Sequence, residues 1–199
     1  FVARIWPMAD GHATRRRTRR TPKPLDRVRL NDLALHYVAR FATSSGKLET
    51  YLRRKLRERG WEGEDEPDVA GLVTRFAEKD YVDDEAYART KATGLLARGY
   101  GARRVEEKLR ADGLSEDLRQ TNAPGEWEAR NAAVAYARRR RFGLFGMSDV
   151  GDNADAARKK REKQLAATLR AGHSFDHARR VVEANAEAEL EEWVEEARD

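Results

Sequence analysis

The stretch "GYGARRVEEKLRADGLSED", residues 99–117, contains the pattern that decides the fold. Val105 and Leu109 stand four residues apart among charged residues, which is the spacing of one apolar face of a helix. Gly113 follows where a left-handed helix cap favours glycine, and Ser115 is a typical N-cap residue. The stretch therefore predicts a basic helix that ends at Gly113 and a short helix that begins after Ser115.

The same arrangement occurs three times in the chain. Each copy joins the end of a basic helix to a glycine and then to the next element: "KLRERGWEG" at 55–63, "KLRADGLSE" at 108–116 and "TLRAGHSFD" at 168–176. The third copy is one residue shorter between its leucine and its glycine, and the intervals between the three glycines differ. We infer a degenerate internal repeat. Helical periodicity around each copy predicts an all-α chain of three tandem three-helix repeats, with about nine helices.

Charge and turn signals divide the chain further. Residues 1–20 hold six arginines and one aspartate, whereas residues 183–199 hold eight acidic residues and one arginine. Pro22 and Pro24 break the arginine-rich start, which we expect to be a flexible arm. The predicted units are a basic arm at 1–25, repeat 1 at 26–80, repeat 2 at 81–124, repeat 3 at 125–185 with a long loop at about 142–157, and an acidic C-terminal extension at 186–199.

Composition favours thin stacked modules over one compact globule. Apolar residues make up 40% of the chain and charged residues 38%, against about 45–50% and about 25% in typical soluble domains. Stacked repeats need fewer apolar residues because each repeat packs only against its neighbours, so we expect an elongated molecule. The absence of cysteine excludes disulfides and thiolate metal sites. No apolar run is long enough to span a membrane, and we expect a cytoplasmic protein and a monomer.

Three adjacent carboxylates in "YVDDEAYART", residues 81–90, raise the question of catalysis. The start of a helix explains them better, with Asp83 as the cap and with Asp84 and Glu85 in the first turn, near the positive end of the helix dipole. His173 and His177 are four residues apart but fall across a predicted glycine stop and serine cap, so we do not expect a metal pair. No HExxH, GxxxxGK[ST], GxSxG or GxGxxG motif occurs. The sequence predicts no catalytic residue, no metal, no cofactor and no small-molecule substrate.

Three segments together resemble the RecX family of bacterial recombination regulators, over roughly residues 30–185. "YLRRKLRERG" at 51–60 resembles the family's first-repeat helix. "LVTRFAEKDYVDDEAYARTKA" at 72–92 resembles the segment between its first and second repeats, with Tyr81, Asp84, Tyr87 and Ala88 at the matching positions. The stretch at 99–117 resembles its most characteristic part. The chain departs from the family in the arm "RRRTRR", in the loop 142–157 and in the acidic tail 183–199.

The resemblance implies an activity as well as a fold. It implies a curved array of three three-helix repeats that binds the filament of the RecA recombinase. It also implies modulation, usually inhibition, of ATP hydrolysis, strand exchange and co-protease activity by RecA, together with nonspecific binding of single- or double-stranded DNA. It implies no enzymatic activity and no membrane partner.

Basic helices are the better candidates for contact with a partner. Stacked repeats would align these helices along one surface, which suits a phosphate backbone or an acidic groove. The structural alternative is a set of solvated helix faces whose aliphatic stems cover the core. The candidate residues are Arg53, Arg54, Lys55, Arg57, Arg103, Arg104, Lys108, Arg110, Arg139, Arg140, Lys159 and Lys160, and the expected structural caps are Asp83, Asp84, Gly60 and Gly113.

Two other functional classes fit short helices with basic faces. One is a stand-alone helical DNA- or RNA-binding regulator, which would bind a specific sequence without RecA. The other is an adaptor whose acidic tail recruits a basic partner. The sequence does not distinguish inhibition of RecA from activation.

Overall fold

A computed structural model describes residues 23–146 and 154–198. Within these ranges the chain forms ten α-helices and one short 3-10 helix, and it has no β-strand. The predicted all-α fold of three-helix repeats is therefore confirmed. Most of the arm 1–25 and part of the loop 142–157 lie outside the described residues. No helix among the described residues is long and apolar enough to cross a lipid bilayer.

The first repeat consists of α1 (Arg27–Arg40), α2 (Ser45–Arg59) and α3 (Val69–Glu78). Leu48 and Leu52 of α2 are completely buried between the other two helices, in a core that also includes Phe76. The chain before α1 joins this repeat through Leu25, which pairs with the residues on either side of Trp61. Repeat 1 therefore has its own core and a covered end.

The second and third repeats follow the same helix order. Repeat 2 contains α4 (Asp84–Ala97), α5 (Ala102–Ala111) and the short α6 (Glu116–Thr121), around Val105 and Leu109. Repeat 3 contains α7 (Glu126–Arg140), α8 (Ala154–Arg170) and α9 (Phe175–Glu183), and the 3-10 helix Gly143–Phe145 lies inside the predicted loop. The acidic extension forms a tenth helix, α10 (Glu187–Glu195), whose Leu190 is completely buried in the core of repeat 3.

Local sequence signals set the helix ends. Side-chain oxygens of Asp or Ser residues accept a backbone N–H at the N-caps of six helices: Asp26, Ser44, Asp68, Asp83, Ser115 and Ser174. Gly60, Gly113 and Gly172 follow the ends of α2, α5 and α8 with φ of 80°, 78° and 97°, a left-handed region that disfavours other residues. The repeated glycine of the sequence is thus the stop of the middle helix in every repeat.

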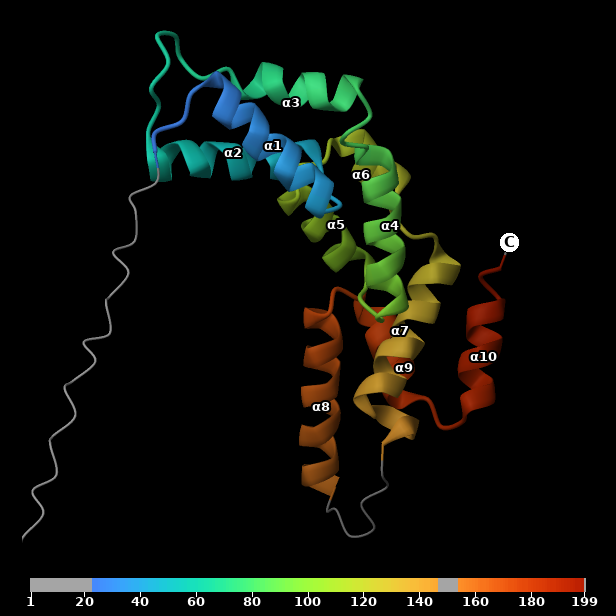
Figure 1. Ribbon diagram of the computed structural model, residues 1–199. Coiled ribbons are helices and arrows are strands. Elements are labelled where there is room, and N and C mark those ends of the chain that lie inside the picture. Colours follow the sequence, from blue (N-terminus) through green and yellow to red (C-terminus); the bar gives the residue numbers. More distant parts are fainter. Residues whose placement is uncertain (1–22, 147–153, 199) are drawn as a thin grey trace, which may run out of the picture.

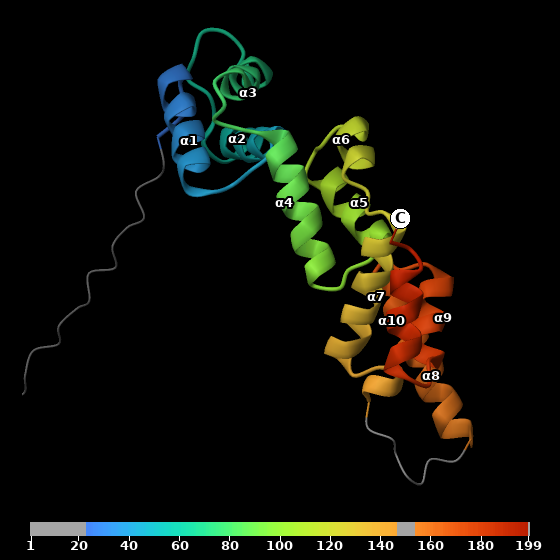
Figure 2. The ribbon, with the colours of Figure 1, turned by 90° about the vertical axis from the view of Figure 1, so that its right-hand side faces the viewer.

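The three repeats form an elongated, bent molecule. Figure 1 shows repeat 1 lying across the top and repeat 3 running downward, with repeat 2 between them. Figure 2, turned by 90°, shows the same succession, with α10 packed along the outside of repeat 3. The expected elongated and curved shape is therefore observed.

Candidate partner-binding surface

The middle helices α2, α5 and α8 are joined head to tail, because the start of one contacts the end of the next. At the first junction, Gly46 in the first turn of α2 faces Gly113 after α5. A Cβ on Gly46 would lie 2.6 Å from the Cα of Gly113, too close for any side chain. Ser44, the cap of α2, donates a hydrogen bond from Oγ to the carbonyl of Asp112. Repeats 1 and 2 are therefore connected by backbone in direct contact.

Polar side chains of repeat 2 lie beside this first junction, and Lys47 of repeat 1 donates across it to Tyr87 Oη at 3.2 Å. The carboxylate of Asp112 is 4% exposed and accepts hydrogen bonds from Lys108 Nζ and from Tyr87 Oη, the latter at 2.8 Å. Burial opposes the charged form of Asp112, but the hydrogen bonds from Lys108 and Tyr87 hold its pKa below the ordinary value. Burial and the bond to Asp112 raise the pKa of Tyr87, so its hydroxyl stays protonated and donates. Asp84 adds a further link, since its Oδ1 accepts the N–H of Ser45 at 2.7 Å.

The second junction uses mainly backbone groups. The N–H groups of Gly101 and Arg103, at the start of α5, donate to the carbonyls of Ala171 and Gly172, at 3.0 and 3.2 Å. A Cβ on Gly172 would lie 2.5 Å from the backbone nitrogen of Arg104. The Arg103 guanidinium also reaches α8, where it donates to the carbonyl of Leu169 at 2.6 Å. Repeats 2 and 3 are thus joined by backbone hydrogen bonds, to which the Arg103 side chain adds one contact.

His173 is buried in this second junction. Its Nε2 lies 3.0 Å from the carbonyl oxygen of Gly99, so Nε2 carries the proton and donates. Its Nδ1 is buried without a hydrogen-bond partner, and its ring packs against Tyr136 with centroids 5.7 Å apart. Burial lowers the pKa of His173, which favours the neutral ring. His177 instead contacts Glu126 at 3.0 Å, and no group of three or more possible metal ligands occurs in the described ranges.

Most predicted basic residues on α2 and α5 are exposed but paired on their own helix. Arg53 pairs with Glu49, Arg54 and Lys55 pair with Glu58, Arg104 pairs with Glu107, and Arg110 pairs with Glu106. Exposed pairs of this kind contribute roughly 0–1 kcal/mol, so they exchange readily for an anionic partner. Arg57 is exposed and has no carboxylate in ion-pair range among the described residues. Arg103 and Lys108 belong instead to the junctions.

Several predicted basic residues come together in repeat 3, between the end of α7 and α8. A hollow of about 630 Å³ there is lined by Arg140, Lys159 and Lys160, all predicted from the sequence, together with Lys163 and Arg170. Among the described residues, its lining contains no carboxylate, and Phe142 and Ala167 supply apolar surface. Lys163, the last residue of the run "ARKKREK", and Arg170, which lies beyond it, were not among the predicted residues, although their seven-residue spacing places them near one helix face. Arg139 faces elsewhere, over the rings of Tyr100 and Tyr136.

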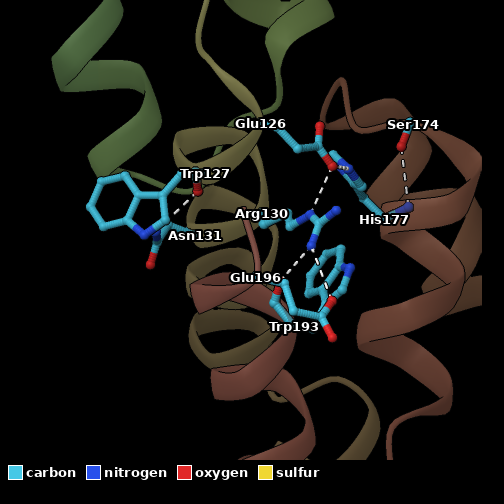
Figure 3. A network of polar contacts seen from close by, with 8 residues as sticks. All are labelled: Glu126, Trp127, Arg130, Asn131, Ser174, His177, Trp193 and Glu196. Carbon is cyan, nitrogen blue, oxygen red and sulfur yellow. Dashed lines mark hydrogen bonds and ion pairs between the residues drawn. The ribbon is translucent and has the colours of Figure 1, made fainter. Parts of the chain in front are cut away.

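The acidic helix α10 is held against repeat 3 by Arg130 of α7, as Figure 3 shows. The Arg130 guanidinium donates to the carbonyl of Trp193 at 2.5 Å, lies 3.6 Å from Glu196 and covers the Trp193 ring at 5.0 Å. Its Nε also donates to Glu126 at 2.8 Å, and this bond holds the pKa of Glu126 below its ordinary value. The extension 186–199 is therefore a packed part of repeat 3 over its described residues.

Comparisons with known proteins agree with this architecture. Residues 83–121 match the model of the second three-helix domain of RecX. The chain is 31% identical over 172 residues to the regulatory protein RecX of Myxococcus xanthus, covering 82% of this chain and 89% of the relative. It is 27% identical over 85 residues to RecX of Vibrio campbellii, covering 41% and 52%.

A crystal structure of RecX from Lactobacillus salivarius shares the fold. The TM-score is 0.56 at 16% sequence identity, and the match covers 78% of this chain and 93% of the other. Identity, coverage and fold thus agree with the repeat structure described above. The chain belongs to the RecX family of regulatory proteins.

Proposed function

We propose that this protein binds the RecA filament and modulates, in the main inhibits, its ATP hydrolysis, strand exchange and co-protease activity. It acts by occupancy and performs no chemistry of its own. The bent row of repeats lies along the filament and bridges neighbouring RecA subunits, which hinders the movements that accompany ATP turnover. Nonspecific contact with DNA adds affinity.

The cationic hollow between α7 and α8 is the observation that carries this proposal. Five basic side chains line it, and none of the described residues in its lining is a carboxylate, so the described part of the hollow favours an anion. Lysine and arginine on a rigid helix suit phosphate or carboxylate groups of a polyanion. The cations of α2 and α5 stand on the other two middle helices of the head-to-tail row. Most are paired with glutamates of their own helix, and exchange of these weak pairs would add contacts with an elongated, charged partner.

RecA-dependent ATP hydrolysis on single-stranded DNA, titrated with this protein at two salt concentrations, tests the proposal. The variant Lys159→Ala with Lys163→Ala removes two cations that line the hollow. We expect it to need on the order of tenfold more protein for half of the effect. Arg158→Ala with Arg161→Ala removes the same charge from α8 outside the hollow and should change the titration much less.

Two results would count against the proposal. One is a RecA ATPase rate that stays unchanged at saturating protein. The other is tight binding to one specific DNA sequence without RecA, which would favour the stand-alone nucleic-acid-binding regulator. If the effect depended strongly on salt and both double variants lost it equally, the hollow would contribute only through its net positive charge and would not be a specific site.

A further inference from the structure

A second concave surface lies away from the basic hollow, between the end of α1 and the length of α4. This groove has a volume of about 710 Å³. It spans the boundary between repeats 1 and 2, since its walls come from the end of α1, the loop to α2, the turn before α4 and α4 itself. The residues that matter for its chemistry are Phe41, Tyr81, Tyr87, Lys47, Lys91 and Arg98.

Two aromatic rings make one part of the groove apolar. Phe41 and Tyr81 are 50% and 52% exposed, and both are among the few large apolar side chains that the described residues leave in solvent. Each ring is supported from behind, because Tyr37 packs on Phe41 at 5.3 Å and Phe76 packs on Tyr81 at 5.5 Å. Rings held in this way lose little conformational entropy when a partner covers them, which is typical of an anchor site.

Two lysines make the other part of the groove basic. Lys47 and Lys91 place their ammonium groups 5.5 and 5.8 Å from the centre of the Tyr87 ring. Within the described part of the chain, neither has a carboxylate in ion-pair range, although Lys47 Nζ donates to Tyr87 Oη at 3.2 Å. The Asp112 carboxylate, which binds Lys108 and Tyr87, attracts both lysines from farther away. Burial lowers the pKa of Lys91. The Lys91 ammonium group has therefore already lost part of its water shell. An anion that binds it would cause little further desolvation of this group.

The two parts are arranged along α4. Tyr81 and the acidic residues Asp80 and Asp83 stand at the start of this helix, and Asp83 is occupied as its cap. Lys91 lies two turns further along, and Arg98 follows the last turn. At about 1.5 Å per residue, Arg98 stands roughly 20 Å from Asp83. The groove thus changes from apolar and weakly acidic at one end to basic at the other.

We infer that this groove binds a short protein segment in which an apolar anchor is followed by acidic residues. The anchor covers Phe41 and Tyr81, and the acidic residues meet Lys91 and Arg98. A single strand of nucleic acid fits less well, because it carries a phosphate at every nucleotide, whereas Asp80 and Asp83 lie at one end of the groove. The inference goes beyond the proposed function, since it concerns different residues and does not require that the segment come from RecA.

Fluorescence anisotropy with a labelled peptide of two phenylalanines followed by four glutamates tests the inference on the full-length chain. We expect saturable binding that falls at least about tenfold in Lys91→Glu and similarly in Phe41→Ala. A matched peptide with four lysines should bind the parent poorly and Lys91→Glu better. Arg57→Glu is the matched control, because it reverses an exposed cation outside the groove and should leave peptide binding unchanged.

Circular dichroism spectra that match the parent would show that the variants are folded. The inference would be overturned if the acidic peptide failed to bind at millimolar concentration, or if it bound Lys91→Glu and Phe41→Ala as tightly as the parent. It would also be overturned if a labelled thymidine 12-mer bound with the same dependence on Lys91 and Phe41, which would assign the groove to nucleic acid. RecA-dependent ATPase measured on the same variants would report on the proposed function separately.

Discussion

The two junctions between repeats have the same close backbone contact but are held by different hydrogen bonds. In both, a glycine after one middle helix lies against the start of another, with no room for a side chain. Junction 1–2 adds hydrogen bonds across it from Ser45 to Asp84 and from Lys47 to Tyr87, beside a charged cluster of Asp112, Lys108 and Tyr87 on its repeat 2 side. Junction 2–3 adds backbone hydrogen bonds and the neutral, buried His173. Glycine therefore sets how closely repeats approach, while the side chains set how each junction responds to pH.

The largest effect is expected from Gly172→Ala, which breaks junction 2–3. A left-handed φ costs roughly 1–2 kcal/mol for alanine, and the Cβ would collide with the backbone of Arg104. We expect a loss of about 3–5 kcal/mol in the free energy of unfolding. In urea, repeat 3 should then unfold separately from repeats 1 and 2.

Gly94→Ala is the control, because a Cβ there meets nothing within 4 Å in the middle of α4. It should stabilise the chain by about 0.5–1 kcal/mol. If both alanine variants behaved alike, close backbone contact would not be what couples the repeats.

Asp112→Asn tests the charged cluster that lies beside junction 1–2. The variant keeps the shape but loses charge-assisted hydrogen bonds, and we expect a loss of about 2 kcal/mol at neutral pH. Because the folded-state pKa of Asp112 lies below its ordinary value of 3.8, its contribution is present above that value and is lost as the pH falls through the lower pKa. Unfolding followed from pH 6 to pH 2 should show the parent approaching the variant in acid. A constant difference across this range would contradict the role of the charge.

His173→Gln tests junction 2–3 in a different pH window. The folded-state pKa of His173 lies below 6.5, so the unfolded chain takes up the proton first and the parent loses stability as the pH falls below 6.5. Glutamine retains an N–H donor for Gly99 and does not titrate. We expect a loss of about 1 kcal/mol at pH 8 and a weaker pH dependence from pH 8 to pH 5.5. A pH profile parallel to that of the parent would show that His173 does not control this junction.

The smallest effect is expected from Arg103→Ala. Arg103 contacts the carbonyl of Leu169 across junction 2–3, but its side chain is 62% exposed. Exposed polar contacts contribute little, so thermal unfolding should report a loss of about 0.5 kcal/mol or less. A loss above about 2 kcal/mol would show that junction 2–3 depends on side chains as strongly as junction 1–2 does.

Helix ends were the most predictable part of the fold. The helix expected to start after Asp83 is α4 (Asp84–Ala97), the basic helix expected to end at Gly113 is α5 (Ala102–Ala111), and the short helix expected after Ser115 is α6 (Glu116–Thr121). These ends follow from caps and glycines, which act locally. The contact of Gly46 with Gly113 was not predicted, because it joins residues far apart in sequence. The small residues at 44–46 and Gly101, at the start of two middle helices, were the available signal.

The basic surface was predictable in composition but not in arrangement. The sequence identified Arg140, Lys159 and Lys160, which the fold brings together around one hollow. It did not separate them from Arg103 and Lys108, whose side chains span or support the junctions. A charge count cannot distinguish these roles, because the difference depends on which carbonyl or carboxylate a tertiary contact supplies. The groove beside α4 was missed for the same reason, since only the fold brings Phe41 and Tyr81 into the lining of one groove.

At Gly60, the free end of the head-to-tail row of middle helices is covered by the chain itself. Gly172 offers its carbonyl to the N–H of Arg103 in the next helix, whereas the carbonyl of Gly60 accepts the N–H of Leu25 at 3.0 Å. The chain's own leading segment thus occupies the place where another unit would add. A further repeat therefore cannot add at that end of the row in the way that α5 adds to α8. Such a stop limits a self-complementary module to a finite length and guards it against fibre formation.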